Sequence, residues 1–255
     1  MGYALVISLL AGLFTAVGGA VALLMPPREK AVAAGMGFAG AVMVTVSLGD
    51  LLPEAFSAYR AAAAPFAAAG KTVSLFCLGA VAALLLGRLL PDEGKLLAKT
   101  GDSEQKAAAL HSALVTVAVV VLHNLPEGVV TLFTSYADRR LGLPVALAIG
   151  MHNLPEGIVI AAPVLYATGK RGRAFWASLL SGLAEPLGAA AAFFFFRGAF
   201  NALFLDGLLC VVAGMMCAVS WSELLRLGYD TDSGSCIGGA LAGCAVMCFG
   251  IYCIS

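Results

Sequence analysis

The sequence predicts an all-α protein that crosses a membrane several times. Of its 255 residues, 61% are hydrophobic and only 12% are charged, which is about half the charged share usual in soluble domains. The mean hydropathy is +0.95. The apolar residues are gathered in runs about as long as a spanning helix, which needs about 20 residues. These runs show no alternation of apolar and polar residues, so membrane strands are not expected.

Eight apolar runs are separated by short turn-like stretches. The predicted spanning helices are 3–24, 33–58, 73–90, 107–135, 143–168, 174–196, 199–225 and 236–254. The polar connection 91–106 is too short for a second domain, so residues 1–255 are expected to form one transmembrane domain. No basic residue precedes the first span, which is therefore expected to be a retained helix rather than a signal peptide.

Lysine and arginine set the expected orientation. The connections after the odd-numbered spans, with the residues that flank them, hold ten of the 15 basic residues, and the other connections hold five. Because basic residues favour the cytoplasmic side, both termini are expected on the extracytoplasmic side and the connection 91–106 in the cytoplasm. The net charge is zero, so charge predicts no nucleic-acid partner. The partner expected from composition is the lipid bilayer.

Several acidic residues fall within the predicted spans, while no lysine or arginine lies deep in any of them. The candidates for a role within the membrane are Asp50, Glu54, Glu127, Glu156, Glu185 and Glu223. An ionised side chain at the bilayer centre costs about 2.5–3.5 kcal/mol on insertion scales. Without basic partners, carboxylates at that depth are either protonated, as in a proton relay, or neutralised by a cation from solution.

The six residues HNLPEG occur twice without change, at 123–128 and 152–157. In each copy the histidine and the glutamate are four residues apart and share a helix face, with the asparagine nearly on the same face. Imidazole and carboxylate together are ligands for zinc and other first-row divalent metals. The asparagine adds a neutral oxygen that a proton relay does not need. The motif therefore favours a cation site made by His123, Asn124, Glu127, His152, Asn153 and Glu156.

Each motif also contains a proline inside a predicted helix. Pro126 and Pro155 cannot donate to the carbonyl four residues earlier, so each helix is expected to kink beside the candidate ligands. Both motifs lie roughly 14–20 Å from the turn that joins their helices, near the bilayer midplane. Because these helices are antiparallel, the repeat predicts a pseudo-two-fold axis in the membrane plane. The eight spans would then form an inverted repeat (3+2+3) with the site between the halves.

Other spans carry further candidates. Glu185 stands in "SGLAEPLGAA", where Pro186 follows it, so it is expected beside another kink. The stretches "SLGDLLPEAF" and "SWSELLRLG" place Asp50, Glu54 and Glu223 in the second and seventh spans. These three acids are weaker candidates, for gates or staging positions along a transport pathway.

The paired HNLPEG motifs, followed by "SGLAEPLGA" in the sixth span, resemble the ZIP family of divalent-metal transporters, in particular its prokaryotic ZupT/GufA-type branch. The resemblance covers the whole chain. It implies import of zinc, with iron, manganese and cadmium as further candidates, across the cell (inner) membrane by alternating access. It also implies a binuclear midplane site in spans four, five and six, in which Glu127 and Glu156 bridge the metals and Glu185 is a further ligand. Metal is then the cargo rather than a cofactor.

Two features depart from familiar members of that family. The connection 91–106 has no histidine, whereas many relatives carry a His-rich one, so metal sensing is not expected there. Asn153 stands where some zinc-selective members have an aspartate. One negative charge fewer is expected to weaken divalent binding and to broaden selectivity. Spans rich in small residues suit close helix packing, which makes a homodimer a candidate assembly.

Two other functions fit parts of the pattern. An intramembrane metal-dependent hydrolase would need a pattern such as HExxH, with two histidines four residues apart and a general base. Each motif here reads HNxxE, and no further acid or base stands out, so neither an enzyme nor a catalytic residue is expected. A proton channel or relay would work without metal and without the histidines. Uptake of metal distinguishes the three functions.

Overall fold

The computed structural model describes residues 2–24, 28–90, 104–137, 139–195 and 202–254. Every regular element in these residues is a helix. Seven helical segments are long and apolar enough to cross a membrane. The expectation of an all-α polytopic membrane protein is therefore confirmed.

The helices follow one another along the chain with short connections. They are α1 (Gly2–Leu24), α2 (Glu29–Val46), α3 (Leu52–Ala62), α4 (Pro65–Leu89), α6 (Glu104–Ala137), α7 (Arg139–Thr168), α8 (Arg171–Gly182), α9 (Ala184–Phe195), α10 (Ala202–Val219), α11 (Arg226–Thr231) and α12 (Ser233–Ile254). Two π-helical turns, η1 (Ser47–Leu51) and η2 (Ser220–Leu225), join α2 to α3 and α10 to α11. Two of the predicted spans are therefore composite helices.

The described parts of the predicted spans all fall on helices, but the helices do not have the predicted ends. The helix α4 begins at Pro65 rather than near residue 73, because proline is favoured in a first helical turn and the alanines around it are strong helix formers. The predicted fifth span lies in α7, which is helical throughout but is not among the seven segments, so the count of eight stays a prediction. Most of the connection 91–106 lies outside the described residues, and α6 begins at Glu104.

The motif prolines do not interrupt their helices. Both α6 and α7 continue as α-helix past Pro126 and Pro155, so the expected kink at each proline stays a prediction. Each proline removes only one backbone hydrogen bond, and closely packed neighbouring helices tolerate that loss within a membrane. The sixth span is interrupted as expected, at Leu183 between α8 and α9. Further irregular backbone lies at η1 and η2.

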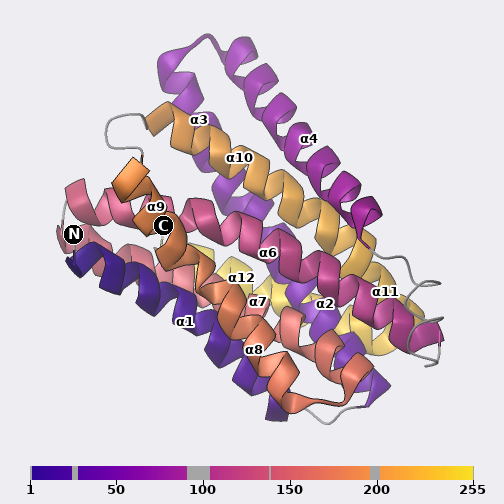
Figure 1. Cartoon of the computed structure of the whole chain (residues 1–255). Helices are drawn as coiled ribbons and strands as arrows, with labels where there is room; N and C mark the ends of the chain where they lie inside the picture. Colours follow the sequence, from indigo (N-terminus) through magenta and orange to yellow (C-terminus); the bar gives the residue numbers. More distant parts are fainter. Residues whose placement is uncertain (1, 25–27, 91–103, 138, 196–201, 255) are drawn as a thin grey trace.

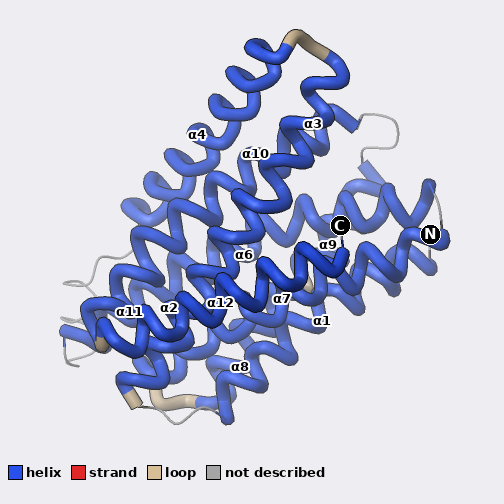
Figure 2. The backbone as a smooth tube through the Cα atoms, turned by 180° about the vertical axis from the view of Figure 1, so that it is seen from behind, coloured by secondary structure: helices blue, strands red, loops and turns tan. Residues whose placement is uncertain are grey.

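The helices form two groups that meet along α6 and α7 (Figures 1 and 2). One group contains α1, α6, α7, α8 and α9, and the other contains α2, α3, α4, α10, α11 and α12. The main contacts between the groups are those of α2 with α7 and of α10 with α6. Both chain termini lie at the same end of the bundle (Figure 1). The motif-bearing helices thus lie at the junction of the two groups.

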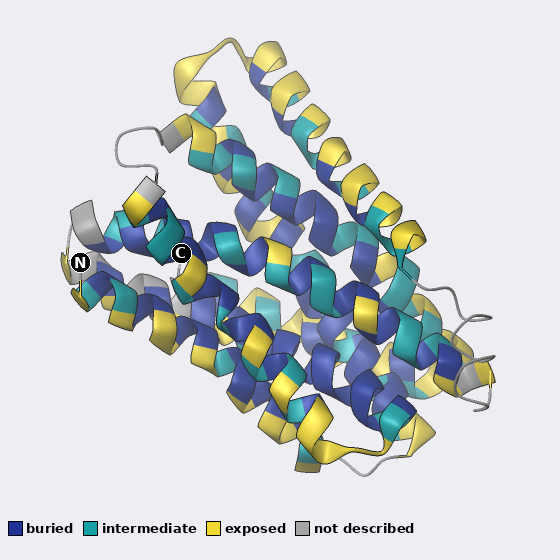
Figure 3. Ribbon diagram, in the orientation of Figure 1, coloured by how far each residue is buried: buried dark blue, intermediate teal, exposed yellow. Residues whose placement is uncertain are grey.

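Burial follows this arrangement (Figure 3). The centre of the molecule is buried, whereas only 17% of the residues are buried in an apolar 18-residue stretch of each of α4 and α12. Most of the exposed side chains along α4 are apolar, for example Val73, Leu78, Val81 and Leu85. Such an outer face is expected of a helix that lies against hydrocarbon rather than water.

Candidate metal site

The two HNLPEG copies meet inside the bundle as a pair of crossed contacts. The Nε2 atom of His123 on α6 lies 2.8 Å from Oε1 of Glu156 on α7. The Nε2 atom of His152 on α7 lies 3.2 Å from Oε1 of Glu127 on α6. Each histidine is therefore bonded to the glutamate of the other copy, as a two-fold relation between antiparallel helices requires.

All seven candidate ligands are buried. Five of them have no exposed surface, namely His123, Asn124, Asn153, Glu156 and Glu185. Glu127 is 3% exposed and His152 is 8% exposed. Burial of this many polar groups is costly unless each finds a partner. The pair of His152 and Glu127 is also the more accessible half of the cluster.

The two asparagines connect the motifs to the first and sixth spans. The amide of Asn124 donates to the carbonyl oxygen of Ser181 on α8 at 3.1 Å. The amide of Asn153 donates to the carbonyl oxygen of Ala11 on α1 at 3.2 Å and to a carboxylate oxygen of Glu185. Glu185 is thereby held against the second motif. The cluster thus includes α1, whose part the sequence analysis missed.

Several acceptors in the cluster have no hydrogen-bond partner among the described residues. They are Oε2 of Glu127, Glu156 and Glu185 and Oδ1 of Asn124 and Asn153. An unsatisfied buried polar group costs about 1–3 kcal/mol, and carboxylate and amide oxygens are suitable ligands for divalent cations. In the described residues, no three His, Cys, Asp or Glu side chains already surround one point as a preformed metal site. Instead, the imidazoles bond directly to the carboxylates.

The final glycine of each motif brings backbones into contact at the site. A Cβ atom on Gly128 would overlap the carbonyl oxygen of Glu185 on α9, and one on Gly157 would overlap the carbonyl oxygen of Thr15 on α1. Only a residue without a side chain permits this approach. The glycine therefore sets the distance between each motif helix and the helix that supplies the next polar residue.

A cavity of about 650 Å³ reaches the cluster from the end of the bundle that holds the termini. Glu127 and His152 lie among its lining residues, together with Asp50 of η1 and Glu54 of α3. Both of these acids are exposed. The structure therefore places two of the three weaker pathway candidates in one cavity with the candidate ligands.

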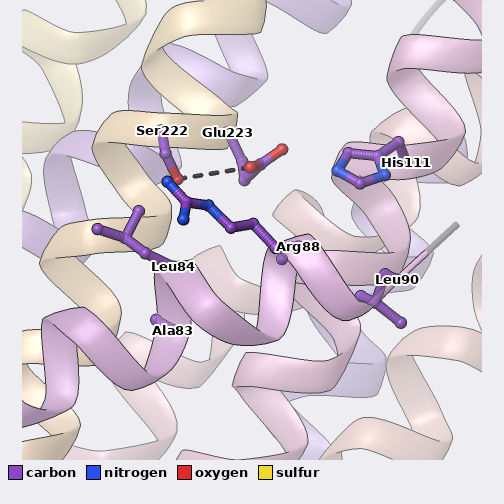
Figure 4. Close-up of a pocket in the computed structure, with 8 residues that line it drawn as sticks. Ala83, Leu84, Arg88, Leu90, His111, Ser222 and Glu223 are labelled. Carbon is purple, nitrogen blue, oxygen red and sulfur yellow. Dashed lines mark hydrogen bonds between the residues drawn. The ribbon is translucent and has the colours of Figure 1, made fainter. Parts of the chain in front are cut away.

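The third candidate lies elsewhere. Glu223 of η2 lines a pocket of about 430 Å³ at the opposite end of the bundle, together with Arg88, His111 and Ser222 (Figure 4). The hydroxyl of Ser222 donates to Glu223 at 3.5 Å, and Arg88 extends toward these two residues (Figure 4). None of the seven candidate ligands lines this pocket. The structure does not bring Glu223 to the central cluster.

A weak internal repeat relates α1, whose part in the cluster was not predicted, to α8 and α9. The stretch "LAGLFTAVGGA" begins at Leu10 and "LSGLAEPLGAA" begins at Leu180, and the two are identical at five of eleven positions. In this alignment Ala11 corresponds to Ser181, and both of their carbonyls accept a hydrogen bond from a motif asparagine. The leucine and glycine pattern was visible in the sequence, but its polar residues differ between the copies.

Comparison with known proteins identifies the family of the chain. Residues 88–251 match the family model described as ZIP Zinc transporter. The protein "Zinc transporter ZupT" of Corynebacterium aurimucosum is 35% identical, over 97% of this chain and 95% of the relative. The proteins of the same name from Escherichia fergusonii, at 35% over 97% and 95%, and Chlorobium luteolum, at 34% over 96% and 95%, are similar. The chain belongs to the ZIP zinc transporter family.

Proposed function

We propose that the protein imports zinc and related divalent cations across the cell membrane through a binuclear site between α6, α7 and α9. The observation that carries this proposal is the crossed pairing of His123 with Glu156 and of His152 with Glu127. Two buried histidines and three buried carboxylates converge from three helices, with open acceptor oxygens on each carboxylate. Three relatives that cover nearly the whole chain carry the name zinc transporter.

Metal binding would replace the crossed hydrogen bonds with metal–ligand bonds. Zinc takes nitrogen from neutral imidazole and oxygen from carboxylate. Glu127 and Glu156 each approach a histidine of the other motif, so each is placed to bridge two metal ions, with Glu185 as the third carboxylate. Two divalent ions carry four positive charges against these three carboxylates. The remaining positive charge favours release over permanent retention.

The cavity that contains Asp50 and Glu54 provides the path into the site. Its two exposed acids attract cations toward Glu127 and His152. We place this cavity and both termini on the extracytoplasmic side, from the distribution of lysine and arginine. Glu223, in the pocket at the opposite end, is then a candidate for the path out. Iron, manganese and cadmium remain candidate cargoes, and a homodimer remains a candidate assembly.

Alternating access would require the two groups of helices to move relative to each other. The candidate ligands all lie on α6, α7 and α9, within one group. The other group meets it mainly through α2 and α10, whose contacts near Val159 are apolar and therefore carry no directional bonds. We propose that the group with the ligands shifts against the other, so that the site opens first to one side and then to the other.

The alternative functions find less support. A hydrolase needs an acid or base beyond the metal ligands, and the family is one of transporters. A proton relay accounts for the glutamates, but not for two asparagines whose Oδ1 acceptors are buried and open. Metal transport would use both the glutamates and the asparagines as ligands.

The test is zinc uptake by the purified protein in liposomes. The variants His123→Ala and Glu156→Ala are expected to reduce uptake at least tenfold, because each removes a ligand and leaves its partner unpaired. Glu29→Gln changes an exposed glutamate in the first turn of α2 and serves as the matched control. Uptake that is unaffected by both ligand changes would contradict the proposal, and zinc-independent proton flux would favour the relay.

A further inference from the structure

The helices α1 and α8–α9 are related by the same pseudo-two-fold axis as the two motifs. A Cβ atom on Gly12 would overlap the carbonyl oxygen of Gly182, and one on Gly182 would overlap the carbonyl oxygen of Gly12. The contact is reciprocal, as expected where a two-fold axis passes through a helix crossing. The alignment that begins at Leu10 and Leu180 pairs these same two glycines.

The contacts on either side of this crossing repeat in the same register. Gly18 of α1 faces the carbonyl oxygen of Leu154, and Gly188 of α9 faces that of Leu125. Leu154 and Leu125 are the leucines of the two HNLPEG copies. The final glycines of the motifs face the carbonyls of Thr15 and Glu185 in the same way. Thr15 therefore occupies on α1 the position that Glu185 occupies on α9.

The Cβ atoms of Thr15 and Glu185 occupy equivalent places beside the glycine crossing. A Cβ atom on Gly12 would lie 3.6 Å from Cβ of Glu185, and a Cβ atom on Gly182 would lie 3.0 Å from Cβ of Thr15. Asn153 bonds to the carbonyl of Ala11 and also to Glu185. Asn124 bonds in the same way to the carbonyl of Ser181. The same symmetry therefore predicts that Asn124 lies beside Thr15, as Asn153 lies beside Glu185.

The bond that symmetry would place between Asn124 and Thr15 is not made. Thr15 has no exposed surface, and its hydroxyl oxygen has no hydrogen-bond partner among the described residues. The Oδ1 atom of Asn124 is buried and without a partner there too. A threonine is shorter than a glutamate, so its hydroxyl does not reach as far into the cluster as a carboxylate at the same position would. Two polar atoms that both need a partner therefore lie on the side of the cluster opposite Glu185.

We propose that Thr15 is a further positioning residue of the metal site, whose hydroxyl holds a water beside the bound metal. This inference rests on the proposed function, because it assumes that the cluster binds metal. Glu185 supplies a negative charge to the cluster from α9, and Thr15 supplies only a neutral hydroxyl from the equivalent position on α1. The α1 side of the cluster therefore contributes to zinc binding through a hydrogen bond rather than through charge.

The first test compares zinc binding by purified variants, measured by titration calorimetry. Thr15→Val keeps the shape of the side chain and removes the hydroxyl. It is expected to raise the Kd for zinc about three- to tenfold, which corresponds to the loss of one hydrogen bond. Thr15→Ser is expected to recover most of the lost affinity. Thr72→Val makes the same change at a buried threonine of α4 and is expected to bind zinc like the wild type.

A Thr15→Val protein that binds zinc like Thr72→Val would overturn the inference. Failure of the proposed function would give a different result, since the wild-type protein would then bind no zinc. The comparison of valine with serine separates the hydroxyl from packing, because a purely structural role would not be rescued by the smaller serine.

The second test moves the carboxylate from position 185 on α9 to the equivalent position 15 on α1. Glu185→Thr is expected to weaken zinc binding at least tenfold, because it removes a charged ligand. The double variant Thr15→Glu/Glu185→Thr is expected to recover affinity, because the carboxylate then enters from the equivalent position on α1. A folded double variant that binds zinc no better than Glu185→Thr would overturn the inference. If the double variant does not fold, the valine and serine comparison decides.

Discussion

The amide of Asn153 donates both to the carbonyl oxygen of Ala11 and to the carboxylate of Glu185. A neutral donor at this position holds Glu185 in place without adding charge. An aspartate would have no hydrogen to donate and would face Glu185 as a second negative charge. The asparagine therefore stabilises the cluster without metal, and in the proposed site it would limit the negative charge available to a bound metal ion.

Replacing Asn153 by aspartate is expected to have opposite effects on stability and on metal binding. Asn153→Asp should lower the free energy of unfolding without metal by about 1–3 kcal/mol, because a buried donor is replaced by a repelling acceptor. It should raise zinc affinity at least tenfold and narrow the metal preference. Thermal unfolding with and without zinc measures both effects. Asn153→Ala removes the donor alone, and equal zinc-induced shifts in Asn153→Asp and the wild type would contradict this account.

At the residue scale, the sequence was informative where it repeats itself. The seven candidate ligands could be predicted because HNLPEG is duplicated and because Glu185 is an acid in an apolar span, and the structure brings all seven into one cluster. The role of α1 was missed, since Thr15 is an ordinary residue in an apolar helix. Glu223 was expected on the pathway by its likeness to Asp50, but sequence alone could not show that it faces a separate pocket.

At the scale of elements, the motif glycines fix the helix crossings. Gly157→Ala is expected to disrupt the site, because its Cβ would overlap the carbonyl oxygen of Thr15 and the backbones would have to separate. We expect a loss of stability of about 2–4 kcal/mol and of most zinc uptake. Gly238→Ala on α12, where no atom lies within 4 Å of the new Cβ, is the control and should be neutral or stabilising by about 0.5–1 kcal/mol. Equal behaviour of the two variants would refute the close crossing.

The start of α12 depends on the ionised form of Asp232. The backbone amide of Ser235 donates to Oδ1 of Asp232 at 2.8 Å, and hydrogen bonds from the side chain and the amide of Ser235 lower the pKa of Asp232 below its ordinary value. A lowered folded-state pKa means that the stabilisation is complete above the ordinary pKa of aspartate and is lost as pH falls through the folded-state value. The Tm difference between wild type and Asp232→Ala should therefore be present at pH 7 and shrink in acid. A difference independent of pH would contradict the cap.

Helix type was predictable at this scale, whereas helix irregularities were not. A helix that is apolar on every side does not show in its sequence which face packs against its neighbours. The ends of α4 and the continuity of α6 and α7 past their prolines depend on those neighbouring helices. The π-helical turns η1 and η2 occur at "SLGDL" and "SWSELL", where the two halves carry Asp50 and Glu223. Such turns are frequent at functional sites, but no local residue pattern announced them.

At the scale of the whole molecule, the two helix groups are expected to move relative to each other during transport. Ala39 of α2 and Val159 of α7 lie in one apolar cluster that joins the groups. In a protein without native cysteines, a disulfide between cysteines at these positions should block zinc uptake, retain zinc binding and be reversed by reduction. Cysteines at Ile7 and Ala146 lie within one group, and their disulfide should leave uptake largely intact. Full uptake by the first cross-linked protein would exclude a relative shift of the groups.

The overall fold was predictable because hydropathy alone places helices in a membrane. The internal symmetry was predictable only where the motif itself is repeated. The reciprocal crossing of Gly12 and Gly182 is the contact expected if the relation extends to α1 and α8, where the polar residues differ. Such differences would hide a repeat in the sequence while the glycine contacts keep it in the structure.

The central claim, that the two motifs form one binuclear metal site, is tested most directly by X-ray absorption spectroscopy of the zinc-loaded protein. The account predicts imidazole nitrogen and carboxylate oxygen ligands at about 2.0–2.2 Å and a second zinc at about 3.5–4 Å. Glu127→Gln should abolish the zinc–zinc signal while leaving imidazole ligation, because a bridging carboxylate is lost. Sulfur ligation at about 2.3 Å, or zinc with no imidazole nitrogen and no neighbouring metal, would contradict the account.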